Sequence, residues 1–207
     1  MVKEGFPFVG FAFLIAVIFA VCAVVFASAL LWIGAGVFIL LAVFTAYFFR
    51  DPQRVISDES DIIVSPADGR VTRVEENETG KFISIFLSPV DVHINRAPIA
   101  GKITKIDYVF GKKMPATSNN ASLINERNSL TIKGEKITVV CTQIAGIVAR
   151  RIVCWKKAGE DLTLGEKFGL IKFSSRTDLQ MPFNVDLMVK VDDRVKGGES
   201  VIGKIRS

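Results

Sequence analysis

The first quarter of the chain is a continuous apolar stretch, whereas the rest alternates between short apolar runs and polar residues. No charged residue occurs from Gly5 to Phe49. This stretch is longer than a signal-peptide core of about 7–15 residues, and it can accommodate two membrane-spanning helices of about 20 residues each. A break near Ala27-Ser28 predicts helices over residues 7–26 and 29–49, so residues 1–50 are expected to form a membrane anchor.

The charges beside this stretch predict its orientation. Lys3 precedes it, and Arg50 and Arg54 follow it. Because basic residues favour the cytoplasmic side, both ends of a helical hairpin are expected there, with the remaining domain on the cytoplasmic side of the cell membrane. Gly34 and Gly36 lie in the second helix and leave a shallow re-entrant hairpin as an alternative.

Residues 51–207 have the pattern of a mainly β domain. Short runs rich in Val, Ile and Phe are bounded by Gly, Pro, Asn and Asp, and no segment keeps a helical period beyond about ten residues. The polar segment from Gly111 to Asn128 is expected to be a functional loop. The predicted strands are Lys81–Leu87, Lys102–Val109, Ser129–Lys133, Lys136–Thr142, Gly146–Val153, Gly169–Phe173 and Val185–Val191.

A weak internal repeat runs through this domain. Gly69, Gly101 and Gly146 each precede a short β run, and the stretches 159–169 and 196–203 each contain Gly-Glu followed by another Gly. Glycine permits sharp bends and close approach of strands. The pattern resembles the flattened β-sandwich or barrel of biotinyl and lipoyl domains, duplicated within one chain.

Charge and composition narrow the set of partners. The net charge of +5 lies in residues 50–207, because Lys3 and Glu4 are the only charged residues before Arg50 and they cancel. A positive domain tied to a bilayer is attracted to anionic head groups by about 1 kcal/mol per well-placed basic residue, although an ordinary basic protein carries the same charge. Without a concentrated Lys/Arg tract, a nucleic-acid partner is not expected. Three cysteines without metal-ligand spacing and one histidine predict neither a disulfide framework nor a metal site.

Three segments carry residues suited to chemistry, although each alone has an ordinary structural explanation. The pair Ser174-Ser175 follows a predicted strand and has the composition of a solvated turn. His93 is the only histidine, and its unperturbed pKa suits proton transfer near neutral pH, although a single histidine is more often structural. Asp68 lies in Ser-Pro-Ala-Asp-Gly, which is typical of a turn between strands.

The order of the motifs is more specific than any one of them. After the apolar stretch come Phe-Arg-Asp-Pro, Ser-Pro-Ala-Asp-Gly, Leu-Ser-Pro with His93, Asn-Glu-Arg-Asn and Phe-Gly-Leu-Ile-Lys-Phe-Ser-Ser-Arg. From Tyr47 to the C-terminus this order resembles the short form of phosphatidylserine decarboxylase. The resemblance implies a membrane-bound, pyruvoyl-dependent carboxy-lyase that converts phosphatidylserine to phosphatidylethanolamine.

The resemblance also implies how the cofactor arises. Ser175 matches the serine that becomes a covalent pyruvoyl group when the protein cuts its own bond between Ser174 and Ser175. The products, residues 1–174 and 175–207, would stay associated as a heterodimer, with further oligomerisation left open. The pyruvoyl ketone would form a Schiff base with the substrate amine and take up the electrons that CO₂ leaves behind. Asp68 matches an aspartate associated with self-cleavage, and His93 a histidine implicated in decarboxylation.

Two positions depart from the family pattern. Ser174 stands where the family usually has Gly, and Arg96 stands where longer members have a second His. Arg cannot act as a base, so the base for self-cleavage is left open among His93, Asp68 and water. The substrate phosphate and carboxylate require cationic partners, and Arg suits both groups. The candidates are Arg70, Arg96, Arg127 and Arg176.

Three alternative functions are compatible with parts of this pattern. A different serine-headed lipid, such as an ether lipid, would use the same chemistry. A non-catalytic, membrane-anchored module with a biotinyl-like fold would need a modifiable Lys beside Met, which Lys113-Met114 matches poorly. The third is a family member that has lost self-cleavage through Ser174 and remains intact.

Overall fold

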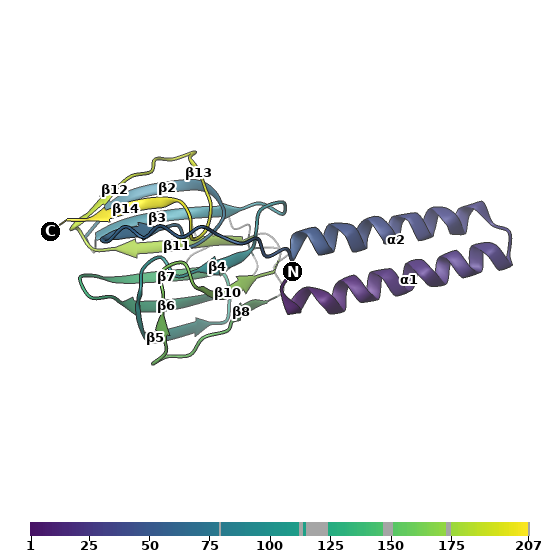
Figure 1. Cartoon of the computed structure of the whole chain (residues 1–207), viewed down its shortest axis with the longest axis horizontal. Coiled ribbons are helices and arrows are strands. Elements are labelled where there is room, and N and C mark those ends of the chain that lie inside the picture. The colour runs from purple at the N-terminus through teal and green to yellow at the C-terminus, as the bar shows by residue number, and fades with distance from the viewer. Residues whose placement is uncertain (79, 112–113, 115–123, 147–150, 173–174, 207) are drawn as a thin grey trace. The chain divides into compact units, whose positions relative to one another are not determined.

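The chain divides into two compact units, Met1–Gln53 and Arg54–Ser207. A computed structural model describes residues 1–78, 80–111, 114, 124–146, 151–172 and 175–206 (Figure 1). Of the predicted features, Ser174, Lys113 and most of the Gly111–Asn128 loop lie outside the described residues.

The first unit is a helical hairpin. A 3₁₀ turn, η1 (Lys3–Gly5), leads into α1 (Phe6–Val25), and α2 (Ala29–Phe48) returns after a break at Ala27, whose φ is +47°. The prediction of two helices that separate near Ala27-Ser28 is confirmed, and α2 runs unbroken through Gly34 and Gly36. Both helices are long and apolar enough to cross a membrane, with mean hydropathies of 3.0 and 2.4.

Small side chains let the two helices approach each other. Ala12, Ala16 and Ala23 of α1 and Ala35 and Ala42 of α2 are buried, whereas most larger apolar side chains of the hairpin are exposed. In water these exposed side chains would forfeit the stabilisation gained by burying apolar surface, so they fit a lipid environment. The hairpin therefore has the features of a membrane anchor.

The second unit is built from β-strands. Its described strands form one curled eight-stranded sheet, in the order β13-β2-β3-β11-β7-β6-β5-β9, and two three-stranded sheets, β1-β14-β12 and β4-β10-β8 (Figure 1). The mainly β prediction is confirmed. The strands are β1 (Ile62–Val64), β2 (Gly69–Asn77), β3 (Gly80–Leu87), β4 (Ile94–Arg96), β5 (Gly101–Val109), β6 (Arg127–Lys133), β7 (Thr138–Ala145), β8 (Ile152–Cys154), β9 (Asp161–Leu162), β10 (Lys167–Ile171), β11 (Ser175–Met181), β12 (Val185–Leu187), β13 (Arg194–Val195) and β14 (Val201–Ile205).

The strand order reveals an internal duplication with one copy inserted into the other. The inserted half consists of β4 to β10, and the outer half consists of β1 to β3 with β11 to β14. Each strand of the outer half has an equivalent in the inserted half. The equivalent pairs are β1 and β4, β2 and β5, β3 and β6, β11 and β7, β12 and β8, β13 and β9, and β14 and β10. The two central strands, β7 and β11, are antiparallel equivalents that pair at Cys141 and Leu179.

Backbone details repeat between the halves and fix which residues are equivalent. The register of β2 shifts after Val71, and that of β5 shifts after Ile103. The N–H of Val64 donates to the Pro98 carbonyl, and the equivalent N–H, that of Arg96, donates to the Pro66 carbonyl, both at 2.9 Å. Likewise the N–H of Ile205 binds the Asp61 carbonyl, and the N–H of Ile171 binds the His93 carbonyl.

Alternating inward-facing residues supply the core. Ile83, Ile85 and Leu87 of β3 are fully buried and pack with residues such as Leu130 and Ile132 of β6. Burial of each such side chain contributes about 1.5–3 kcal/mol. This apolar core fixes the positions of the central strands at which the candidate site is built.

Several predicted strand boundaries were wrong for identifiable reasons. Strand β7 begins at Thr138 because a tight turn occupies residues 134–137, where the N–H of Gly134 binds the Ile137 carbonyl at 2.9 Å. Strand β12 ends at Leu187, and the chain turns again at Asp192, whose φ is +77°. Gly146 follows the end of β7, although it was predicted to precede a strand. Arg127 and Asn128 belong to β6, although they were predicted to lie in the loop.

Candidate active site

Ser175 is the first residue of β11, a central strand of the large sheet. It pairs with Leu87 of β3 on one side and with Ala145 of β7 on the other. Its side chain is fully buried, and its Oγ has no hydrogen-bond partner among the described residues. A buried hydroxyl without a partner costs about 1–3 kcal/mol, so an apolar residue would stabilise this position better. The inserted half has such a residue, Ile137, at the equivalent position.

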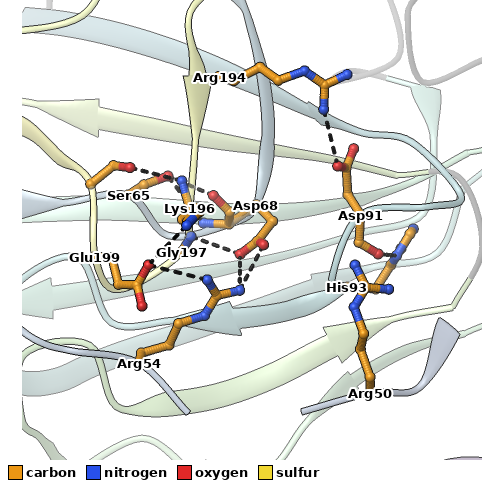
Figure 2. Close-up of polar contacts among 12 residues, drawn as sticks. Arg50, Arg54, Ser65, Asp68, Asp91, His93, Arg194, Lys196, Gly197 and Glu199 are labelled. Carbon is orange, nitrogen blue, oxygen red and sulfur yellow. Dashed lines mark hydrogen bonds and ion pairs between the residues drawn. The ribbon is translucent and has the colours of Figure 1, made fainter. Parts of the chain in front are cut away.

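Asp68 lies in the turn between β1 and β2, where it is bound by a buried arginine. Nη2 of Arg54 donates to both carboxylate oxygens at 2.9 and 2.7 Å, and the backbone N–H of Gly197 donates at 2.8 Å (Figure 2). The side chains of Arg54 and Asp68 are only 7% and 14% exposed. Arg54 also forms an ion pair with Glu199 at 3.4 Å. The carboxylate is therefore fixed in place before any reaction begins.

Burial dominates the electrostatics of this carboxylate. It raises the pKa of Asp68 above the ordinary value of 3.8, and the Gly197 N–H and the Arg54 guanidinium oppose that rise. The Asp91 carboxylate raises the pKa of Asp68 further, which places the two acidic groups within electrostatic reach. A carboxylate with a raised pKa is a stronger base than an ordinary one once it is ionised.

His93 is buried directly before β4. Its Nδ1 lies 3.0 Å from the backbone carbonyl of Asp91, as Figure 2 shows. A carbonyl can only accept, so this contact places the proton of the neutral ring on Nδ1 and makes Nε2 the basic nitrogen. The Asp91 side chain is itself fixed by the backbone N–H and hydroxyl of Ser88, at 2.8 and 2.7 Å.

Hydrogen bonds join the three segments that carry these residues. The N–H of Arg96 donates to the Pro66 carbonyl, which connects β4 to the turn that holds Asp68. The side-chain amide of Asn95 donates to Thr177 Oγ1 at 2.8 Å, which connects β4 to β11. The segments that carry His93, Asp68 and Ser175 are thus linked to one another through hydrogen bonds of β4. Asp68 itself does not form a hydrogen bond with the serine hydroxyl.

The internal duplication independently relates the three positions. Residues equivalent to them line one cavity of about 210 Å³, which we call the equivalent cavity. These residues are Asp61 for the histidine, Ala100 for the aspartate and Ile137 for the serine. Because both halves share one backbone plan, we infer that Asp68, His93 and Ser175 lie near one another in the same way. The equivalent cavity contains an ion pair between Asp61 and Lys136, at 2.8 Å.

The four predicted anion-binding arginines fall into two groups. Arg96 and Arg176 are buried, and they bind the Gly165 carbonyl at 3.0 Å and the Asp178 carboxylate at 2.9 Å, respectively. Arg70 is exposed, and Arg127 is half-buried beside a cavity of about 150 Å³. Arg70 and Arg127 are thus the more accessible to a phosphate group. Among the described residues, no group of three or more His, Cys, Asp or Glu side chains could hold a metal ion.

Two groups of residues at the site were not predicted. Arg54 was interpreted only as a flanking charge, although it lies two positions after the Phe-Arg-Asp-Pro motif. The other group is a buried set of amide and hydroxyl side chains around Asn95, which joins β4 to the central strands. A comparison of the repeated segments could have indicated it, because Asn95 takes the place of Ile63.

Comparison with known proteins identifies the family. A family model described as phosphatidylserine decarboxylase matches residues 41–203. The phosphatidylserine decarboxylase proenzyme of Desulfotalea psychrophila is 40% identical over 213 residues, covering 98% of this chain and 95% of the relative. That of Symbiobacterium thermophilum is 42% identical, with 98% and 94% covered, and that of Ruegeria pomeroyi is 44% identical, with 100% and 95% covered. The chain therefore belongs to the phosphatidylserine decarboxylase family and is a decarboxylase.

Proposed function

We propose that this chain converts phosphatidylserine to phosphatidylethanolamine by means of a pyruvoyl group that it makes from Ser175 through self-cleavage. The observation that carries the proposal is the buried Ser175 hydroxyl, which has no hydrogen-bond partner among the described residues. A reaction at this oxygen explains why a costly hydroxyl occupies a position where the other half of the domain has Ile137. The relatives are named proenzymes, which fits a precursor that is processed.

The proposed self-cleavage requires no reactant other than the chain itself and one water molecule. Oγ of Ser175 attacks the carbonyl carbon of Ser174 while its proton passes to a base, the C–N bond breaks, and the freed amine takes up a proton. An ester now links the two residues. Loss of the Cα proton of Ser175 breaks its Cβ–Oγ bond, and the oxygen remains with Ser174 as a carboxylate. Water converts the resulting dehydroalanine to pyruvoyl, and ammonia leaves.

The fixed acid and base groups take different roles in this proposal. We assign proton transfer during self-cleavage to Asp68, whose pKa burial raises and whose orientation Arg54 and Gly197 fix. We assign proton return to the substrate carbon to His93, because Nε2 is the nitrogen that exchanges a proton when Nδ1 faces the Asp91 carbonyl. Arg96 binds the Gly165 carbonyl and serves neither step as a base.

The surroundings of Ser175 fit a pyruvoyl group. Hydrogen bonds from β3 and β7 hold β11 on both sides, so residues 175–207 would stay bound to residues 1–174 as a heterodimer after the cut. A small, uncharged ketone can replace the serine in this buried position without leaving a charge in the core. The group would supply a carbonyl that condenses with the substrate amine and accepts the electron pair released with CO₂.

The helical hairpin gives the proposed substrate a physical context. Its two apolar helices fit insertion into the bilayer, and Lys3, Arg50 and Arg54 favour the cytoplasmic side for both of its ends. A tethered catalytic domain would then stay near the depth of lipid head groups at the cytoplasmic surface of the cell membrane. The exposed Arg70 and the half-buried Arg127 are the proposed contacts for the phosphate.

The test is the intact mass of the purified full-length protein, with Ser175→Ala and Ser174→Ala as matched variants. We expect the wild type to yield two chains, with the C-terminal one lighter than residues 175–207 by the mass of one ammonia. Ser174→Ala should be cut in the same way, whereas Ser175→Ala should stay whole. A wild type that remains one chain during incubation in lipid vesicles would overturn the proposal, and cutting in Ser175→Ala would reassign the nucleophile.

A further inference from the structure

A row of buried polar side chains crosses the sheet at Thr177, two residues beyond Ser175 on β11. Thr177 of β11 lies opposite Gln143 of β7, and Gln143 lies opposite Asn128 of β6. The Asn95 side chain of β4 closes the row, because its Nδ2 donates to Thr177 Oγ1 at 2.8 Å and its Oδ1 accepts from Gln143 Nε2 at 2.9 Å. All four side chains are at most 1% exposed.

Hydrogen bonds extend this row to the turn that holds Asp68. Nδ2 of Asn95 also lies 3.4 Å from the carbonyl oxygen of Pro66, two residues before the aspartate. Oε1 of Gln143 accepts from Asn128 Nδ2 at 2.9 Å. One asparagine therefore joins the strand that follows His93, the aspartate turn and the two central strands.

The fold itself does not require these polar residues. The other half of the domain fills the positions equivalent to Asn95, Gln143 and Thr177 with apolar side chains that are buried in the core. These are Ile63, Met181 and Val139, respectively. Apolar residues of similar size stabilise a core without demanding mutual hydrogen bonds, so the polar set has a reason other than stability.

We propose that Asn95, Gln143 and Thr177 are positioning residues that hold the start of β11 against the turn with Asp68 and the strand after His93, and so set the rate of self-cleavage. This inference rests on the proposed function. Hydrogen bonds are directional, so a polar set constrains the approach of one strand to another more narrowly than apolar contacts alone do. Thr177 is two residues beyond Ser175 on the same face of β11, so its hydrogen bond fixes the face that carries the reacting hydroxyl.

The network has a second role after the cut. Asn95 and Gln143 belong to residues 1–174, and Thr177 belongs to residues 175–207, so the bond at 2.8 Å joins the two proposed chains. It would keep the start of the short chain attached to β4, the strand that follows the histidine, after the covalent connection is lost. The same three residues would therefore position both the precursor and the processed site.

The decisive variant copies the other half of the domain into this one: Asn95→Ile, Gln143→Met and Thr177→Val combined. We expect the full-length variant to fold, with a melting temperature equal to or above that of the wild-type precursor, but to cut itself about a hundredfold more slowly on timed denaturing gels. The matched control is Thr142→Val, which removes the Ser129–Thr142 hydrogen bond, 2.9 Å long, from the other face of β7. It should cut at the wild-type rate.

Single variants keep the test decisive if the triple variant does not fold. Thr177→Ser retains the hydroxyl and should cut within about threefold of the wild type, whereas the isosteric Thr177→Val, which we expect to fold, should be slow. For the fraction that is cut, turnover per pyruvoyl should fall in Thr177→Val and recover in Thr177→Ser. Equal cutting rates for Thr177→Val and Thr177→Ser, or wild-type cutting by the folded triple variant, would overturn the inference alone. A wild type that is never cut would overturn the proposed function and this inference with it.

Discussion

The candidate active site and the equivalent cavity are built on the same backbone plan, and only the first carries the serine, aspartate and histidine proposed to react. The strand order, register shifts and paired backbone hydrogen bonds repeat between the halves. The equivalent positions differ in their side chains: Ser175 against Ile137, Asp68 against Ala100, and His93 against Asp61. Since the backbone forms with either set, the fold does not explain the first set, and the proposed reaction does.

The two regions also differ in how the chain passes through them. In the inserted half, β6 and β7 are joined by the tight turn over residues 134–137. In the outer half, the chain leaves the equivalent strand at Leu87 and returns only at Ser175, after the whole inserted half. The bond proposed for cleavage therefore lies where a continuous hairpin has been opened. The duplication offers an internal control for each site residue.

The largest effect is expected when Asp68 is replaced by Ala, the residue type at the equivalent position, Ala100, in the other half. Asp68→Ala removes the proposed base, and we expect self-cleavage to slow by about 10²–10⁴-fold, the usual contribution of a positioned base. The control is Asp61→Ala, which removes a carboxylate from the equivalent cavity and should leave cutting unchanged. The measurement is the precursor fraction on denaturing gels over time. If Asp68→Ala cut itself at the wild-type rate, Asp68 would not be the base for self-cleavage.

A change at the histidine should separate the two reactions. His93→Gln keeps a hydrogen-bonding side chain but cannot carry a proton, so we expect decarboxylation per pyruvoyl group to fall by about 10²-fold. The two chains should still form, because the proposed base for self-cleavage is Asp68. Release of CO₂ from vesicles that contain phosphatidylserine measures the first effect, and intact mass measures the second. If His93→Gln stayed whole, the histidine would belong to self-cleavage as well.

The ion pair at the aspartate predicts a pH dependence. Burial raises the pKa of Asp68, so self-cleavage in the wild type should slow on acidification through a midpoint above 3.8. Arg54 opposes that rise, so Arg54→Leu should raise the pKa further and move the midpoint to higher pH. Loss of the pair should also lower the free energy of unfolding by about 1–3 kcal/mol, between the values for exposed and buried pairs. An unmoved midpoint in Arg54→Leu would mean that another group titrates.

The smallest effect is expected at the equivalent cavity. Lys136 and Asp61 form an ion pair at 2.8 Å, but their side chains are 49% and 28% exposed. Lys136→Ala should change the free energy of unfolding by less than about 1 kcal/mol, because solvent screens such pairs. Chemical denaturation measures this change, and both self-cleavage and decarboxylation should keep wild-type rates. A large loss of either activity would mean that the two regions do not act separately.

The parts of the fold with regular patterns could be predicted from the sequence. The uninterrupted apolar residues of α1 and α2 predicted the hairpin, and the short runs Lys81–Leu87 and Lys102–Val109, rich in β-forming residues and bounded by Gly or Ser-Pro, predicted β3 and β5 within one residue. Strand β11 was missed because its buried face begins with Ser175 and Thr177 and its other face contains a buried ion pair, so no alternation is visible. A hydropathy pattern predicts a strand by assuming that buried residues are apolar, whereas the first residues of β11 are both polar and buried.

The site could be predicted only in part. The motif order singled out Asp68, His93 and Ser175, but it contained no information about Arg54, whose role depends on a contact made after folding. The repeated glycines indicated a duplication, yet one copy is inserted into the other. The spacing between equivalent residues therefore changes along the chain, and the correspondence of Gln143 with Met181 is clear only from the register.

The central position of β11 has a consequence for the lifetime of the proposed two-chain protein. A precursor that unfolds can refold, because all its strands belong to one molecule. After the cut, strands β11 to β14 belong to a separate short chain, and refolding requires two molecules to meet and to insert β11 between β3 and β7. At low concentration that step is slow, so unfolding becomes effectively irreversible. The persistence of the processed protein would then be set by the rate of unfolding rather than by its equilibrium stability.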